Sequence, residues 1–518
     1  MHHQPSTAQA PQGRLPRTVS GLRAKGTVSS ALHLALLLAM GLGAVSGRAQ
    51  APLSLDVSFG CDFNTWYVSS ILPLDDGSLL ASGKMKFGSD LNFKNMMRFL
   101  PNGDRDLGFA TNGAGGGAIK KWGDRLYVEV GQEVRRLFLD GELDNDFITM
   151  STQPFYSALQ GGDYHVYPDG SILMSGAHSL YDTARGFVGI YNLIWFTNTG
   201  HLDTTKTHRY CNGVIYEIEQ QPDGKFLCSG SCNTYEGQPV SRIFRVHADG
   251  ALDTSFNSQV YWGRASAILP LTDGRSILAG RFMRSDVPND TIHIAQVLDD
   301  GTLDPTFDHT VSLGLGTLPN YLDLGADPNS IQHWPGGRYL VTGTFQTVNG
   351  LPRKGICVVD ASGALMPEFA GAGIGSYTYQ GQVLSTVTDA FLTPDNVLYV
   401  YGAYHGYTDG TANDPDQRFI TRLYGPDLNT DVAPEPLNTE AELRVHPNPG
   451  TGAFVLELLL DGPATAQLLD ASGRVVHSQV LISGTERHNL HTGLLPGAYV
   501  LRVRTADGRT LRGKVVVE

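Results

Sequence analysis

Residues Gln220 to Phe256, QQPDGKFLCSGSCNTYEGQPVSRIFRVHADGALDTSF, decide the fold. The segment Val214 to Gln220, which leads into this stretch, alternates apolar and polar side chains. Such alternation is typical of a strand with one buried face. Pro222-Asp223-Gly224 then supplies a tight turn, because proline fixes φ and glycine accepts a positive φ. A second apolar run, Lys225 to Cys228, follows at once, so the two runs predict a β-hairpin.

A third strand and a short tail complete the unit. Arg242 to His247 alternates again and stops at the turn Ala248-Asp249-Gly250, before the tail Leu252 to Phe256, which reads LDTSF. Each unit is therefore predicted to contain three to four short strands. We expect the tail aspartate to cap local backbone amides and the tail phenylalanine to enter the core between units.

The unit recurs along the chain at a period of roughly 40 to 60 residues, which is in the range of propeller blades. Copies align on the first turn and on the tail, although the copy at 124 is reduced and those at 336 and 395 are weak. The sequence predicts an all-β protein with a seven-bladed β-propeller, and six to eight blades are compatible with the pattern. The first turns lie near residues 76, 124, 169, 223, 273, 336 and 395.

One tail has no unit in front of it. Leu55 to Phe59 reads LDVSF, whereas the seventh copy ends without its phenylalanine. We expect the orphan tail to complete the last blade, which would join the two ends of the repeat region and leave no open edge strand. The alternative is that this tail belongs to no blade.

These units resemble the delta-60 repeat family. The family pattern of a Pro-Asp-Gly turn, an apolar strand ending in Gly, an Arg-containing strand and an Asp-Gly-x-Leu-Asp-x-x-Phe tail stands here at 222–256. The resemblance covers residues 55 to about 430 and implies a propeller, which we place at 52–430. It implies almost nothing about chemistry.

Residues 1–51 are predicted to be an export signal. A basic leader precedes the apolar run Ala31 to Val45, and Ala49-Gln50-Ala51 offers the small-x-small pattern that signal peptidase accepts. The alternative is a membrane anchor, but a span needs about 20 apolar residues. No other run is long and apolar enough, so we expect no transmembrane segment in the mature chain.

The charge of the chain argues against a nucleic-acid partner. The net charge is 38 − 51 = −13, and removing the five basic residues before Ala51 gives 33 − 51 = −18. A partner with a phosphate backbone needs clustered Lys and Arg, so we expect no nucleic acid to bind.

Export places the cysteines in an oxidising setting. There are five, an odd number: Cys61, Cys211, Cys228, Cys232 and Cys357. If the turn at Pro222 closes a hairpin, Cys211 and Cys232 both lie beyond its open end and could meet. We predict one disulfide among Cys211, Cys228 and Cys232, whose connectivity the spacing does not give. The alternative is buried free thiols. A zinc site is unsupported, and no metal or cofactor is expected.

The seventh unit carries the richest candidate binding segment, Tyr399 to Gln417, which is predicted to contain a long loop. Aromatic and oxygen-bearing side chains there could stack a sugar ring or hold a calcium ion. A solvated loop with ordinary aromatic packing is the alternative. The candidate ligand-binding residues are Tyr404, His405, Tyr407 and Asp409.

No catalytic residue is assigned, because the chain has no Gly-x-Ser-x-Gly elbow, His-Glu-x-x-His pair or phosphate-binding glycine loop. The favoured hypothesis is a non-enzymatic binding or adhesion module for a glycan or a protein. The second is an extracellular polysaccharide hydrolase or lyase with carboxylates from several blades in the channel, an arrangement that sequence spacing would not reveal. A third is a surface-layer spacer.

The pattern changes after residue 430. Residues 431–440 form a Pro-containing polar linker, and 441–518 contain at least five alternating strands that predict a small β-sandwich. These strands are Phe454 to Leu460, Ala466 to Asp470, Val475 to Leu481, Gly497 to Arg504 and Gly513 to Glu518.

Four short motifs stand in the C-terminal part of the chain: His446-Pro447-Asn448-Pro449, Gly473-Arg474, Gly497-x-Tyr499 and Gly513-Lys514. With these motifs, residues 441–518 resemble the type A sorting domain of the type IX secretion system. The resemblance implies passage through the periplasm and the secretion machinery, then removal of this domain by its sortase and linkage of the cargo to surface lipopolysaccharide. The protein would thus be secreted or displayed on the outer cell surface. An ordinary carbohydrate-binding sandwich is the alternative. The matching residues include His446, Pro447, Asn448, Pro449, Gly473, Arg474, Gly497, Tyr499 and Lys514.

Overall fold

The computed structural model describes residues 51–426 and 444–518, apart from short segments at 62, 64, 89, 286–290, 319–324, 459–463, 470–474, 482–484, 486 and 506–509. The predicted export signal (except Ala51), the linker 431–440 and the motif residues Gly473 and Arg474 lie outside these residues. The chain divides into two compact units, one ending at Pro426 and one beginning at Asp427. Within the described residues the elements are strands, with one 3₁₀ turn at Met150–Thr152.

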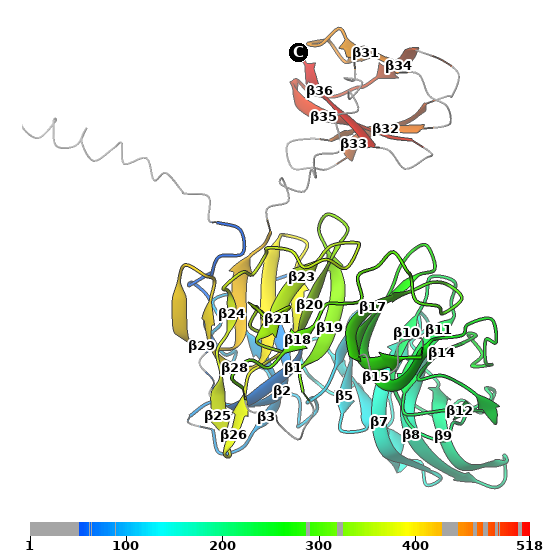
Figure 1. Ribbon diagram of the computed structural model, residues 1–518. Coiled ribbons are helices and arrows are strands. Elements are labelled where there is room, and N and C mark those ends of the chain that lie inside the picture. The colour runs from blue at the N-terminus through cyan, green and yellow to red at the C-terminus, as the bar shows by residue number, and fades with distance from the viewer. Residues whose placement is uncertain are drawn as a thin grey trace, which may run out of the picture. The chain divides into compact units, whose positions relative to one another are not determined.

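The first unit contains seven antiparallel three-stranded groups, which we number sheets 1 to 7 in chain order (Figure 1). One residue pair, Ile215 with Gly176, links sheets 3 and 4. The sheets consist of β1 (Thr65–Pro73), β2 (Leu79–Lys86), β3 (Lys94–Phe99); β4 (Ile119–Trp122), β5 (Arg125–Val130), β6 (Glu133–Phe138); β7 (Tyr156–Val166), β8 (Ile172–Asp182), β9 (Phe187–Phe196); β10 (Ile215–Gln220), β11 (Phe226–Gly230), β14 (Ile243–Val246); β15 (Val260–Pro270), β16 (Ser276–Arg284), β17 (Thr291–Val297); β19 (Asp327–Trp334), β20 (Arg338–Thr344), β23 (Ile356–Val359); and β27 (Thr386–Leu392), β28 (Val397–Thr408), β29 (Asn413–Tyr424).

Short strands decorate these sheets. They form two small hairpins, a three-stranded ribbon and an addition to β28. They are β12 (Thr234–Tyr235) with β13 (Gln238–Pro239), β25 (Tyr377–Tyr379) with β26 (Gln382–Leu384), β18 (Leu313–Gly314) with β21 (Thr347–Val348) and β22 (Leu351–Pro352), and β24 (Gly373–Ile374) on β28.

The first turns have the predicted conformation. Gly224 has a φ of 86°, a region that favours glycine because it has no Cβ. Asp223 Oδ1 accepts a hydrogen bond from the backbone N–H of Lys225 at 3.1 Å. The turn role predicted for the Asp-Gly pairs is therefore confirmed in the hairpin between β10 and β11.

The tails also follow the prediction. Asp253 Oδ1 accepts a hydrogen bond from the backbone N–H of Ser255 at 3.0 Å, and Asp304 does the same with Thr306 at 2.8 Å. The tail phenylalanines are buried in clusters that two consecutive sheets share. These are Phe59, Phe109, Phe147, Phe256, Phe307 and Phe369.

The orphan tail pairs with the last sheet, as predicted. Leu55 forms an antiparallel bridge with Leu423 of β29, and the backbone N–H of Asp56 donates to the carbonyl of Arg422 at 3.0 Å. Strand β1 also contacts β27 and β28, so the blue beginning of the unit lies beside its yellow-orange end (Figure 1). The two ends of the repeat region are thus joined by main-chain hydrogen bonds.

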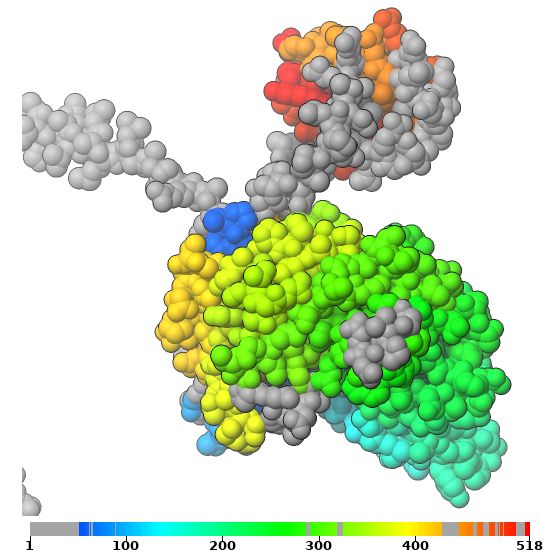
Figure 2. Space-filling view, viewed as in Figure 1, coloured from blue at the N-terminus to red at the C-terminus, as the bar shows by residue number. Residues whose placement is uncertain are grey.

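The core of the first unit lies between sheets rather than at one centre. The cluster between sheets 7 and 1, for example, brings Leu79 and Phe99 against Tyr399 and Ile420. Figure 2 shows side chains filling the spaces between the green and yellow-green ribbons of Figure 1. The middle strand of a sheet is buried along nearly its whole length, as in β11, whereas the first strand, as in β10, has buried residues only at intervals.

The prediction of a long loop within Tyr399 to Gln417 is wrong. Strand β28 continues to Thr408 and β29 begins at Asn413, so only a short turn separates them. The polar and aromatic composition of this segment suggested a loop, but alternate side chains of the long hairpin are buried against sheet 6 and the orphan tail.

The second unit has two antiparallel sheets, of order β30-β31-β34 and β33-β32-β35-β36. Val445, Phe454 and Leu490 of the first sheet share one core with Leu468 and Val515 of the second. Two strands, β30 and β34, were not among the five that were predicted. The strands are β30 (Arg444–His446), β31 (Ala453–Glu457), β32 (Ala464–Leu469), β33 (Val475–Leu481), β34 (Arg487–His491), β35 (Gly497–Thr505) and β36 (Thr510–Val517).

Candidate functional site

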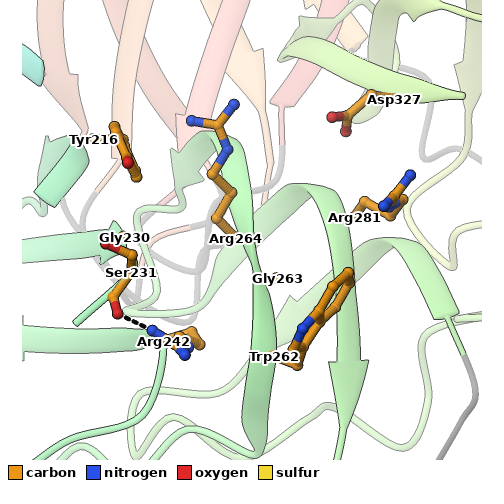
Figure 3. A pocket seen from close by; sticks show the side chains of 9 residues that line it. All are labelled: Tyr216, Gly230, Ser231, Arg242, Trp262, Gly263, Arg264, Arg281 and Asp327. Atoms are coloured by element: carbon orange, nitrogen blue, oxygen red, sulfur yellow. Dashed lines mark hydrogen bonds between the residues drawn. The ribbon is translucent and has the colours of Figure 1, made fainter. Parts of the chain in front are cut away.

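A groove of about 350 Å³ lies among sheets 4, 5 and 6 (Figure 3). Its walls come from the beginnings of β10, β15 and β19, from β16, and from the connection between β11 and β14. A rigid framework of strands therefore positions most of its side chains. We call it the arginine groove, and its aromatic and charged lining consists of Tyr216, Arg242, Trp262, Arg264, Arg281 and Asp327.

Two arginines dominate the groove. Arg264 on β15 is directly opposite Arg281 on β16, and directly opposite residues of an antiparallel pair share one face of the sheet. Within the described ranges neither guanidinium has an ion-pair partner. Instead Arg264 lies over the ring of Tyr216 at 4.9 Å and Arg281 lies over the ring of Trp262 at 5.8 Å.

Asp327, the first residue of β19, brings a carboxylate from sheet 6 to the same groove. Its Oδ1 atom is buried and accepts no hydrogen bond from any described residue. Burial raises the pKa of Asp327 to about 6, while the positive charges of Arg264 and Arg281 oppose this shift. The groove thus contains a carboxylate oxygen that is available to a hydroxyl donor.

The groove arginines differ from the arginines of the repeat. On the third strand of four sheets, an arginine donates from Nε to the tail aspartate at 2.6 to 2.8 Å. That pairing fastens the tail to its sheet. The four pairs are Arg98 with Asp106, Arg136 with Asp144, Arg245 with Asp253 and Arg422 with Asp56.

A disulfide joins Cys211 to Cys232 at the edge of the groove, which is the pairing that the hairpin geometry allowed. The next residue toward the groove, Ser231, accepts a hydrogen bond from Arg242 through its carbonyl (Figure 3). Arg242 also donates to the carbonyl of Cys232 at 3.3 Å. The disulfide therefore fixes the segment that holds Arg242. The cysteines Cys61, Cys228 and Cys357 are free and buried.

A second cluster of charge lies on the first strands of sheets 2, 3 and 4. Ligand oxygens of Asp163, Glu217 and Glu219 all lie within 4.8 Å of one another, and Lys120 Nζ is 3.1 Å from Asp163 Oδ1. Burial raises the pKa of Glu219 to about 7 and the pKa of Glu217 well above its usual value, while Lys120 lowers both. The cluster can hold a proton near neutral pH.

The candidate residues of the seventh unit lie in different surroundings. Tyr404 and Tyr407 are buried in the core between sheets 6 and 7, and the Tyr404 hydroxyl lies 2.8 Å from both Val400 O and Thr421 Oγ1. His405 stacks on Tyr377 with ring centroids 4.2 Å apart. Asp409 Oδ2 accepts the backbone N–H of Leu55 at 2.9 Å. These contacts favour structural roles for Tyr404 and Asp409, whereas Tyr407 OH and His405 Nε2 are buried without a hydrogen-bond partner among the described residues.

The sorting-motif residues meet at one end of the second unit. Asn448 Nδ2 donates to the carbonyl of Lys514 at 2.6 Å, and Asn448 Oδ1 accepts the backbone N–H of Val516 at 2.8 Å. Tyr499 donates its hydroxyl to the carbonyl of Leu495 at 2.8 Å, and Gly497 pairs with Val517. The segment His446 to Pro449 is thereby tied to the last strand through Asn448.

Sequence reasoning missed the arginine groove. Its residues are scattered over three repeats, and β-bulges between Val260 and Trp262 and between Ala265 and Ala267 break the alternation of β15. The only local signal was Tyr261-Trp262-Gly263-Arg264, in which two adjacent aromatic residues are more than 40% exposed.

Comparisons with known families agree with both parts of the chain. Residues 221–256 and 271–307 match the family described as "Domain of unknown function (DUF5122) beta-propeller". Residues 444–518 match "Secretion system C-terminal sorting domain". No curated protein matches the chain. Among solved structures, "Biofilm associated protein - BSP domain" is similar at 10% identity over 91% of this chain and 98% of that chain, with a TM-score of 0.12, which carries no argument.

The sorting domain indicates export by type IX secretion to the cell surface or the extracellular space. The described residues include no helix that is long and apolar enough to cross a membrane. The chain therefore contains repeats that match a β-propeller family and a C-terminal part that matches a secretion sorting domain.

Proposed function

We propose that this protein is a non-enzymatic binding or adhesion module that holds an extracellular glycan in the arginine groove. The observation that carries the proposal is Trp262, a 41% exposed indole in a concave site on rigid strands. Exposed aromatic faces beside fixed polar groups suit sugar rings, which offer apolar C–H faces and hydroxyl edges.

The proposal includes a closed ring of seven blades in residues 52–430. Three observations support it: seven three-stranded groups, cores shared by successive sheets, and the bridge between Leu55 and Leu423. Such a ring would hold the groove rigidly, because each blade packs on two others. Small-angle scattering of the purified protein should then fit a compact disc, and an elongated solenoid would contradict the ring.

The processing of the chain is also a proposal. We expect cleavage of an export signal near residue 51, removal of a β-sandwich sorting domain at 441–518 within or near the linker 431–440, and sortase-dependent attachment to lipopolysaccharide. Intact mass and terminal sequencing of the protein recovered from cells and medium would test this. A mature product that retains 441–518 would contradict it.

The binding test uses purified full-length chain on a broad glycan and protein array. We expect a glycan ligand whose binding Trp262→Ala reduces at least tenfold, as loss of a stacking aromatic does in buried contacts. Tyr181→Ala is the matched control, because Tyr181 is 72% exposed and does not line the groove. Binding that is equally weakened by both changes, or no binding at all, would reject the groove as the site.

A second candidate function is that of a hydrolase or lyase that cleaves an extracellular polysaccharide at the cluster of Asp163, Glu217 and Glu219. The raised pKa values of Glu217 and Glu219 beside Asp163 favour it, since a protonated and an ionised carboxylate are the pair that glycoside hydrolysis uses. Release of reducing ends from mixed polysaccharides by the wild-type chain, and its loss in Glu217→Gln and Glu219→Gln, would support this function over simple binding.

A further inference from the structure

We propose that the arginine groove takes an acidic polysaccharide, whose carboxylate or sulfate group lies between Arg264 and Arg281. This inference rests on the proposed function and names its ligand class. It assigns the anionic group to the two guanidinium groups, the sugar ring to Trp262 and a sugar hydroxyl to Asp327 (Figure 3).

The strongest argument is the position of the two arginines. Like charges directly opposite each other on an antiparallel pair destabilise the sheet, yet Arg264 faces Arg281 in the register of β15 and β16. In the described part of the chain no carboxylate forms an ion pair with either one. Arginines that serve the fold look different here: Arg245, for example, is 1% exposed and donates to Asp253 at 2.8 Å. Both arginines line the groove, so an anion bound there would supply the counter-charge that the described residues do not place beside them in an ion pair.

The charge of the groove is opposite to that of the protein. Three arginines and one aspartate line it, a local balance of 3 − 1 = +2, in a chain whose formal net charge is −13. A guanidinium binds a carboxylate or a sulfate through two parallel hydrogen bonds, which a neutral sugar cannot offer. The local surplus of positive charge therefore selects acidic sugars over neutral ones.

The remaining lining suits the rest of a sugar residue. The ring of Trp262 is exposed on the groove wall, and Asp327 Oδ1 is buried without a hydrogen-bond donor among the described residues. A sugar that stacks on the indole could donate a hydroxyl to this oxygen. Stacking and one directional hydrogen bond together would orient the ring while the arginines hold its acidic group.

The groove continues far enough for a polymer. A second groove of about 250 Å³ shares Arg264 and Asp327 with the first. Its further lining includes the polar residues Asn329, Thr344 and Thr386. Asn329 Nδ2 donates to the carbonyl of Val387 at 2.8 Å, and Thr344 Oγ1 lies 3.0 Å from Thr386 Oγ1. Their oxygens can still accept hydrogen bonds from neighbouring sugar units, so a chain can run across sheets 5, 6 and 7 with its acidic group at Arg264.

The test measures binding of the full chain to polygalacturonate, which carries carboxylates only, to κ-carrageenan, which carries sulfates and no carboxylate, and to fully methyl-esterified polygalacturonate, the uncharged match of the first. We expect the wild-type chain to bind an acidic polymer at least tenfold more tightly than the ester. Arg264→Ala and Arg281→Ala should each reduce that binding at least tenfold and make it less salt-dependent. The control Arg185→Ala, which removes the same charge outside the groove, should bind like wild type.

Melting temperatures without ligand supply a second readout. Because Arg281 forms no ion pair among the described residues, Arg281→Ala should melt close to the wild-type temperature, whereas loss of an arginine that holds a tail aspartate, as Arg245 does, should lower it. The inference is overturned if the ester binds as tightly as the acid, if Arg264→Ala retains full binding, or if either alanine variant is destabilised. If neutral glycans bind and depend on Trp262, the proposed function stands alone; if no glycan binds, both fail. Comparison of the affinities for the carboxylate polymer and the sulfate polymer shows which anion the groove prefers.

Discussion

Arg422 on β29 donates a hydrogen bond to Asp56 across 366 residues of sequence, with 2.8 Å between Arg422 Nε and Asp56 Oδ2. The same aspartate accepts from the backbone N–H and the hydroxyl of Ser58 through Oδ1. Burial raises its pKa, but the hydrogen bonds from Ser58 and Arg422 outweigh burial, so the pKa of Asp56 is lowered. One side chain therefore fastens the beginning of the repeat region to its end.

Asp56→Ala should release this junction. Removing one partner of a partly buried ion pair leaves Arg422 without its carboxylate, and we expect a loss of about 2 to 4 kcal/mol in the free energy of unfolding. Hydrogen exchange should rise in β29. Asp106→Ala is the control, because it breaks the equivalent pair with Arg98 inside sheet 1. Equal hydrogen-exchange protection of β29 in the two variants would contradict this role of the orphan tail.

Loss of the disulfide should destabilise the first unit. Cys211 and Cys232 are separated by 21 residues, and closing a loop of that size stabilises a protein by about 2 to 4 kcal/mol. Cys232→Ala should lower the melting temperature, and the double variant with Cys211→Ala should melt like the single one, because both remove the same bond. A reductant should shift wild type toward the variants. No change with reductant would show that the bond is not formed in solution.

The contribution of Glu219 to the stability of the protein should become more favourable as the pH falls from about 8 toward 5. Glu219 has a pKa raised to about 7 by burial, above the ordinary value of about 4.3 in an unfolded chain. The folded state therefore binds a proton that the unfolded state lacks in this interval, and the cost of ionising Glu219 is fully present only above pH 7.

Glu219→Gln should remove that cost. We expect it to be more stable than wild type by up to about 3 kcal/mol at pH 8 and no more stable below about pH 4.5. Denaturant unfolding at several pH values measures the difference. Glu142→Gln, at an exposed turn, is the control. A wild-type to Glu219→Gln difference that does not vary with pH would contradict the raised pKa.

In the second unit, Asn448→Ala should weaken the attachment of the motif segment to β36. It removes the bonds to Lys514 O and Val516 N, which at an exposed site are worth about 1 kcal/mol in total. We expect lower thermal stability of this unit and less exported protein in a cell that secretes it. Asn489→Ala, at an exposed position of β34, should change neither. Equal behaviour of the two variants would assign no role to Asn448.

Much of the fold could be predicted because its signals are local. A Pro-Asp-Gly turn, a strand and an LDxxF tail are each set by neighbouring residues, so the turn at Gly224 and the cap at Asp253 appear as expected. The partner of Leu55 could also be predicted, since one tail was surplus and one sheet lacked a tail. The hairpin predicted at Pro222 placed Cys211 and Cys232 where they could meet, although the spacing did not give the connectivity.

The candidate site could not be predicted in this way. Tyr404 and Tyr407 looked like loop residues, but β28 runs on to Thr408 and buries both. Conversely, Arg264 and Asp327 line the same groove although they are 327 − 264 = 63 residues apart in sequence. Nothing in either repeat marks them as neighbours.

The sequence by itself determined the repeat, its strands and turns, and the export tail, because hydrophobic alternation, turn residues and motifs act over a few residues. Only the tertiary structure decided which side chains meet. The groove combines the starts of strands from three sheets, and bulges in β10 and β15 set which way their side chains point. Those choices depend on how sheets pack against one another, which is a property of the whole repeat region and not of any single unit.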